Sequence, residues 1–156
     1  MQKSDLQTKI TDFLLNQDDV LFIVFFGSFA RAGYERFRDI DVAVYMTEVP
    51  ELMRIGYLVS ELQHLTGHKV DVVVLNGLYE TNPVLSQEIV GRHKMIPNTR
   101  IKPAAQIADL FAAYCVRSIN TFEDTAPLRR RMNEAFRKRM KEKKFAQFNQ
   151  KNLHNA

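Results

Sequence analysis

Apolar residues along the chain recur with two periods, one typical of helices and one typical of strands. The segment VLFIVFF at residues 20–26 is wholly apolar, which is typical of a strand buried on both faces. Further strands are predicted at residues 39–46, 68–75 and, as a small edge strand, 93–96. Helical spacing predicts helices at residues 4–16, 50–66, 82–91, 103–120 and 126–148, and a short helix or loop that follows Gly27 and ends near Gly33.

Helices and strands therefore alternate over the first hundred residues, and only helices follow. This order predicts an α/β (α+β) body, a small mixed sheet flanked by helices, with a helical C-terminal extension. Pro97 and Pro103 bracket a linker between the two parts. We therefore expect one domain at residues 1–98 and a helical, basic extension at residues 99–156.

Charge is distributed unevenly between these parts. Residues 127–151 hold ten Lys and Arg against two Glu, a net +8, whereas the remainder carries twelve basic and sixteen acidic residues, a net −4. No apolar run approaches the ~20 residues that span a bilayer, and the first residues lack a signal-peptide core. With a single cysteine, Cys115, in an apolar helical context, these features predict a cytoplasmic protein whose thiol packs in the core.

Three aspartates occupy the predicted strands. Asp39 and Asp41 are two residues apart, so they share one face of a strand, and Asp71 lies among valines in the following strand. If these strands are neighbours, three carboxylates converge, and either their pKa values rise or a divalent cation neutralises them. Oxygen ligands suit Mg²⁺ or Mn²⁺, so the acids predict a site for one of these metals.

Gly27 and Ser28 lie between the apolar strand and the predicted start of a short helix. Glycine allows close approach of the backbone to a ligand, free N–H groups at a helix start favour an anion, and Ser28 adds a hydroxyl. A phosphate cradle beside a carboxylate-held metal is suited to phosphoryl or nucleotidyl transfer.

Together these residues spell Gly-Ser-x10-Asp-x-Asp within GSFARAGYERFRDID, followed by a strand aspartate in VDVVVLN. This pattern resembles the polymerase-β-like nucleotidyltransferase superfamily. More narrowly, residues 1–98 resemble the minimal nucleotidyltransferases (MNT), the antitoxins of HEPN/MNT toxin–antitoxin pairs. Two positions depart from many relatives: Ala32 stands before Gly33, and Arg38 stands where serine precedes the first aspartate. Neither departure removes a ligand.

The resemblance implies a role for each matching residue. Asp39, Asp41 and Asp71 would bind Mg²⁺ (or Mn²⁺) ions that bridge the phosphates of ATP, and Asp71 would help to deprotonate the attacking hydroxyl. Gly27, Ser28 and, with less support, Arg31 would contact phosphates. The implied reaction transfers AMP from ATP to a hydroxyl, expected to be a tyrosine, of a cognate HEPN ribonuclease toxin.

Alternatives remain open at this stage. The enzyme could instead modify a small molecule such as an aminoglycoside, although the chain is short for an added acceptor domain. It could also neutralise a partner by binding alone. The basic tail either packs on the body with a solvated face, binds the HEPN partner, or contacts nucleic acid, which is the least favoured of the three.

Overall fold

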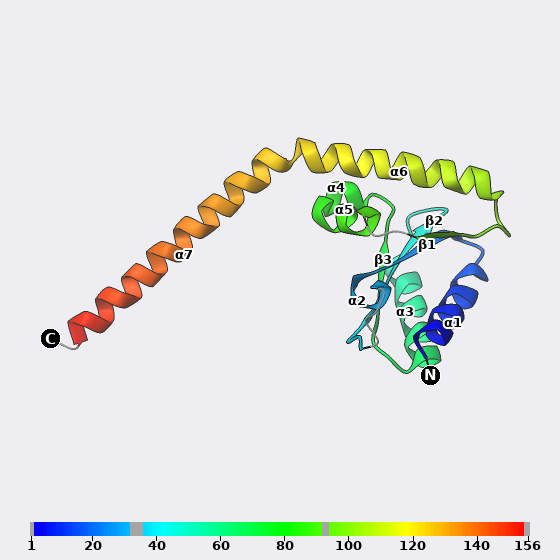
Figure 1. Cartoon of the computed structure of the whole chain (residues 1–156), viewed down its shortest axis with the longest axis horizontal. Helices are drawn as coiled ribbons and strands as arrows, with labels where there is room; N and C mark the ends of the chain where they lie inside the picture. Colours follow the sequence, from blue (N-terminus) through cyan, green and yellow to red (C-terminus); the bar gives the residue numbers. More distant parts are fainter. Residues whose placement is uncertain (1, 32–35, 92–93, 155–156) are drawn as a thin grey trace. The chain divides into compact units, whose positions relative to one another are not determined.

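The computed structural model describes residues 2–31, 36–91 and 94–154, in two compact units, Met1–Thr121 and Phe122–Ala156. The first unit contains a sheet between helices, and the second is helical (Figure 1). The elements are α1 (Lys3–Leu15), β1 (Val20–Phe26), α2 (Gly27–Ala30), β2 (Ile40–Met46), α3 (Leu52–Thr66), β3 (Val70–Val74), α4 (Leu78–Thr81), α5 (Pro83–Gly91), β4 (Met95–Pro97), α6 (Ala104–Asp124) and α7 (Ala126–His154).

The four strands form one mixed sheet in the order β3-β2-β1-β4. Strand β1 runs antiparallel to both β2 and β4, whereas β2 and β3 are parallel. The parallel pair is joined through α3, as a parallel connection requires a crossover. The expected small mixed sheet and its short edge strand are therefore confirmed.

Helices cover both faces of the sheet. On one face α1 and α3 pack against β2 positions such as Ile40, Val42 and Val44, and on the other α5 and α6 pack against β1 and Ala43 (Figure 1). Because β1 lies inside the sheet and is covered on both sides, all seven of its residues are buried. This explains why its sequence shows no polar alternation.

A register shift between Val20 and Phe22 interrupts the pairing of β1 with β2. Leu21 and Phe22 consequently pack in the same core cluster, whereas alternation would place them on opposite faces. From Phe22 onward the pairing is regular and brings Phe26 opposite Asp41. The shift therefore sets which residues of β1 reach the end of the sheet where the aspartates lie.

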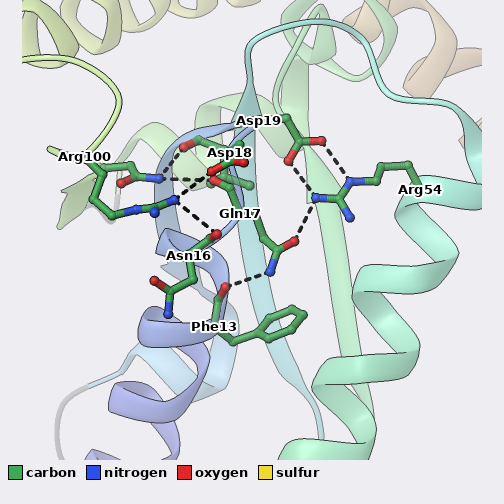
Figure 2. A network of polar contacts seen from close by, with 9 residues as sticks. Phe13, Asn16, Gln17, Asp18, Asp19, Arg54 and Arg100 are labelled. Atoms are coloured by element: carbon green, nitrogen blue, oxygen red, sulfur yellow. Dashed lines mark hydrogen bonds and ion pairs between the residues drawn. The ribbon is translucent and has the colours of Figure 1, made fainter.

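A polar network closes the opposite end of the sheet, where β1 begins (Figure 2). Arg54 donates to both carboxylate oxygens of Asp19, at 2.7 and 2.9 Å, and to Oε1 of Gln17 at 2.9 Å. Arg100 donates to the carbonyls of Leu15 and Asn16, and also pairs with the exposed carboxylate of Asp18 at 3.0 Å. These bonds tie α3 and the segment after β4 to the α1–β1 turn.

Several local expectations change. Helix α1 is preceded by Gln2, whose carbonyl accepts the amides of Asp5 and Leu6, so the helix begins at Lys3, one residue before the predicted limit. Helix α4 was not anticipated from the sequence pattern.

Cys115 is half-buried against the core cluster on the α6 face, and burial raises the pKa of its thiol, which agrees with a packing role. In the described part of the chain, no helix is both long and apolar enough to cross a bilayer.

Residues 99–121, assigned from sequence to the extension, belong to the first compact unit. Ile107, Tyr114 and Ser118 of α6 are buried, and the hydroxyls of Tyr114 and Ser118 each lie 2.7 Å from Oγ of Ser86 on α5. Burial raises the pKa of Tyr114 to about 12, so this hydroxyl stays protonated and joins α6 to α5. The domain boundary after residue 98 remains a prediction.

Candidate active site

Asp41 is the central residue of the candidate site. It is the second residue of β2, opposite Phe26 at the end of β1 and in register with Asp71 on β3. Its neighbours Ile40 and Val42 are fully buried on the α1/α3 side, so alternation turns Asp41 to the α5/α6 side. The carboxylate is half-buried, which places it at the rim of the core.

Asp39 and Asp71 lie on either side of this position. Asp39, half-buried, immediately precedes β2 and shares the side of Asp41, while Asp71 is exposed at the same level on β3. The backbone amide of Ile40 donates to the carbonyl of Lys69 at 3.0 Å, which holds the beginnings of β2 and β3 together. The parallel pairing thus gathers the three aspartates at one end of the sheet.

Gly27 approaches Asp41 more closely than any other residue type would permit. It follows β1 directly with φ of +70°, a conformation that L side chains rarely adopt. A Cβ built on Gly27 would overlap Oδ2 of Asp41 and lie 3.2 Å from its Cγ. The glycine therefore meets two requirements, a left-handed turn and a backbone in contact with a carboxylate.

Aromatic residues anchor the segment around this turn. Phe29, buried in α2, packs on Phe25 of β1 and edge-to-face on Phe37, whose ring centroid is 4.9 Å away. Lys3 donates to the carbonyl of Arg31 at 2.8 Å. Ser28 is half-buried and Arg31 is exposed. The chain is thus held on both sides of residues 32–35. This segment, which includes Ala32 and Gly33, lies outside the described residues.

Charge repulsion and burial act together on Asp41. Burial raises the pKa of its carboxyl, and the negative charges of Asp71, Asp39 and Glu88 raise it further, whereas Lys69 opposes the shift. A carboxyl whose pKa is raised in this way gains from a nearby cation, which favours the ionised form. The electrostatics of the site therefore favour binding of a cation.

A comparison with protein families decides how this geometry is classified. The family described as polymerase beta, nucleotidyltransferase, matches residues 8–101, which include all the site residues named above. The chain belongs to this family. A comparison with curated proteins found no match.

Solved structures share the fold of this nucleotidyltransferase. One chain of a tri-AMPylated Shewanella oneidensis HEPN toxin in complex with MNT antitoxin aligns at a TM-score of 0.64 and 22% identity, over 86% of this chain and 98% of that chain. A toxin–antitoxin pair with AMP-PNP gives 0.63 and 21%, over 87% and 98%. A mutant of the pair MntA-HpeT gives 0.62 and 20%, over 87% and 98%. The expected polymerase-β-like fold is thereby confirmed.

The donor set of this nucleotidyltransferase site suits a hard divalent cation. It offers carboxylate oxygens from Asp39, Asp41 and Asp71, and a half-buried acid with a raised pKa. Within residues 2–31, 36–91 and 94–154, no group of three or more His, Cys, Asp or Glu side chains is placed to hold a metal ion. Mg²⁺ is usually held by one or two carboxylates together with substrate phosphates. The residues fit an ion shared with a nucleotide.

Two charged residues near the aspartates were not anticipated. Nζ of Lys69 lies 4.0 Å from Oδ2 of Asp39, and the charge of Glu88 on α5 acts on Asp41. Strand alternation places Lys69 on the side of Asp71, so the sequence carried a signal for it. Glu88 comes from a helix packed over the sheet, and only the tertiary arrangement brings its charge to Asp41.

Proposed function

We propose that the protein is a Mg²⁺-dependent adenylyltransferase that moves AMP from ATP to a hydroxyl of a partner protein and acts as an antitoxin. The observation that carries the proposal is the contact of Gly27 with Asp41, in register with Asp71. A backbone that closely approaches a carboxylate, beside two further acids, is suited to hold a metal-bound triphosphate.

The structural relatives support the choice of acceptor. Their descriptions pair an MNT antitoxin with a HEPN toxin, record AMPylation of the toxin in one complex, and include AMP-PNP in another. Because this chain has the same fold and covers nearly all of those chains, we assign it a HEPN-family partner. Tyrosine is the proposed acceptor, and the cytoplasm, where ATP is available, is the proposed location.

Each residue has a defined part in this reaction. Gly27 and Ser28 bind the outer phosphates of ATP, and Arg31 adds a cation beside them. Asp39 and Asp41 would hold Mg²⁺, which when bound neutralises charge on the phosphates. The acceptor oxygen bonds to the α-phosphorus as the bond from that phosphorus to the β-bridging oxygen breaks, and pyrophosphate leaves. Asp71 receives the proton of the hydroxyl.

The decisive experiment incubates the protein with ATP labelled at the α-phosphate, Mg²⁺ and a HEPN-family protein of the same genome. Label should appear on the partner, and a Tyr→Phe variant of the acceptor should abolish it. The double variant Asp39→Ala with Asp41→Ala should transfer no label. Asp12→Asn, a change at an exposed residue of α1, serves as the control and should transfer at the wild-type rate.

Two outcomes would redirect the assignment. If the double variant still neutralises the toxin fully, the protein acts by binding alone and transfer is not its mechanism. If ATP is consumed and pyrophosphate released only with a small hydroxylated acceptor, the partner assignment fails while nucleotidyl transfer stands. Mass spectrometry of the partner, where each transferred AMP adds its own mass, separates these cases.

A further inference from the structure

Helix α7 is a long, exposed helix with a strong positive charge. Its 29 residues extend about 43 Å at 1.5 Å per residue. The helix contains ten Lys and Arg and only two Glu, a net charge of +8. Every residue from Arg130 to Leu153 is exposed. Such a surface remains soluble by itself, but its large apolar side chains are also exposed, for example Phe145 at 67%.

No ion pair between described residues involves a cation of α7. The three ion pairs that these residues form all lie between Asp18 and Arg100, in the first unit. Arg129 is engaged differently, because its guanidinium lies over the ring of Phe122, 3.9 Å from the centroid. The cations farther along α7 therefore remain available to an anionic partner, and their density calls for a polyanion.

The distribution of residues around α7 limits which polyanion fits. Side chains are offset by about 100° per residue, so Leu128, Met132, Phe136 and Met140 drift by about 40° at each step, and Phe145 and Phe148 lie on a different side. The cations occur on every side, including the sector of the apolar row. A membrane-surface helix needs one charge-free apolar face, and α7 lacks one.

We propose that α7 is an RNA-binding helix whose cations contact phosphates and whose exposed phenylalanines stack on unpaired bases. Phe136, Phe145 and Phe148 are 61%, 67% and 62% exposed and interleave with the basic residues. Single-stranded RNA presents splayed bases to aromatic side chains, whereas duplex DNA keeps its bases stacked. Repulsion between two helices of net +8 disfavours a second α7 as the occupant.

This inference is independent of the transfer reaction. RNA binding is measured with the full chain, without ATP, by fluorescence anisotropy of a labelled 20-nucleotide single-stranded RNA between 50 and 300 mM KCl. The wild type should bind, and the logarithm of its affinity should fall with the logarithm of salt by about 0.7 per phosphate contacted. Asp41→Asn, which removes a proposed site residue, should bind RNA as the wild type does, so the two proposals fail separately.

The charge test uses two triple variants with equal loss of charge. Arg130→Gln, Arg137→Gln and Lys138→Gln together should weaken RNA binding at least tenfold at 100 mM KCl and make the salt slope shallower by about 2. The control changes Lys9, Lys94 and Lys102, exposed in the first unit, to Gln. An equal loss in the control would assign the effect to net charge and overturn the proposal.

The stacking test compares aromatic with aliphatic side chains on the same helix. Phe136→Ala, Phe145→Ala and Phe148→Ala together should weaken RNA binding at least tenfold with an unchanged salt slope. The matched control, Leu128→Ala, Met132→Ala and Met140→Ala, should leave RNA affinity within twofold. Circular dichroism should show the same helix content in both variants, because alanine favours helix.

Other occupants give distinct results. Equal or tighter binding to a 20-base-pair DNA duplex, or binding only to vesicles of anionic lipid, would replace RNA by that polyanion. If the aliphatic variant loses binding of the HEPN partner and neither variant changes RNA affinity, α7 is a protein-docking helix. Absence of RNA binding at 50 mM KCl and 50 µM protein would also overturn the proposal.

Discussion

The two ends of the sheet shift the pKa of an aspartate in opposite directions. Where β1 begins, Asp19 accepts two hydrogen bonds from Arg54, and this pairing holds the pKa of the aspartate below its ordinary value (Figure 2). Where β1 ends, Asp41 lies against Gly27 and among other acids, and burial together with their charge raises its pKa.

The contrast separates a structural acid, Asp19, from Asp41, the acid that we propose is functional. Asp19 finds its cation within the chain, so folding satisfies it and the result is a fixed turn. Asp41 is left with repulsive neighbours, and among the described residues the exposed Lys69 opposes them. Strain of this kind lowers stability and persists at sites where a ligand relieves it. The raised pKa thus distinguishes the end of the sheet where we propose that ligand binds from the end that stabilises the fold.

The largest expected difference between the two ends is in the rate of AMP transfer when the aspartate is replaced. Asp41→Asn should reduce AMP transfer at least about 100-fold, because it removes a charge needed where the phosphates react. Asp19→Asn should leave the rate per folded molecule within about twofold, since Asp19 contacts only structural partners. Single-turnover transfer of labelled AMP measures both. Equal loss in the two variants would remove the distinction between the ends.

A smaller effect concerns the glycine against the carboxylate. Gly27→Ala should lower the free energy of unfolding by about 3 kcal/mol, from left-handed strain and overlap with Asp41. Gly67→Ala has the same kind of φ, +69°, but open space around the new methyl group, and should cost only about 1 kcal/mol. The free energy of unfolding of both variants, measured with urea, isolates the contribution of the overlap with Asp41. Equal costs would mean that Asp41 moves aside freely.

Loss of the ion pair at the other end should cost less. Asp19→Asn keeps the shape of the side chain but removes its charge from Arg54. The two side chains are 35% and 30% exposed, so solvent screens the pair, and we expect a loss of about 1 kcal/mol. Exposed Asp18→Asn, whose carboxylate is 98% exposed, should change the free energy of unfolding by less than about 0.5 kcal/mol.

The smallest predicted effect is on pH dependence, and its sign differs between the ends. The folded-state pKa of Asp41 is raised above 3.8, so the folded protein binds more protons above that pH, and its stability relative to Asp41→Asn falls as pH rises. The folded-state pKa of Asp19 is lowered, so the stability of wild type relative to Asp19→Asn falls as pH drops below 3.8.

Because Asp41 is partly exposed, screening keeps its pH effect below about 1 kcal/mol. Unfolding by urea at several pH values from 3 to 8 measures both slopes. The paired differences between wild type and each variant cancel the contribution of other groups. Two slopes of the same sign would contradict the assignment of opposite environments.

Parts of this structure were accessible from local pattern. The apolar run at residues 20–26 and the Asp39/Asp41 alternation predicted two strands with correct limits to within one residue. The Gly-Ser-x10-Asp-x-Asp spacing predicted the family, because the whole motif lies within one short segment of the chain. Short elements without a periodic pattern were less accessible, and α4, which has four residues, was missed.

By itself, the sequence determined the strands, the acids they carry and the basic tail, because periodicity, residue type and charge are local properties. Only the tertiary structure decided that Gly27 touches Asp41, that Glu88 and Lys69 act on the same acids, and that Arg54 pairs with Asp19. These relations depend on strand register and on helices packed across the sheet. Long-range packing sets both, and no single segment of the chain encodes them.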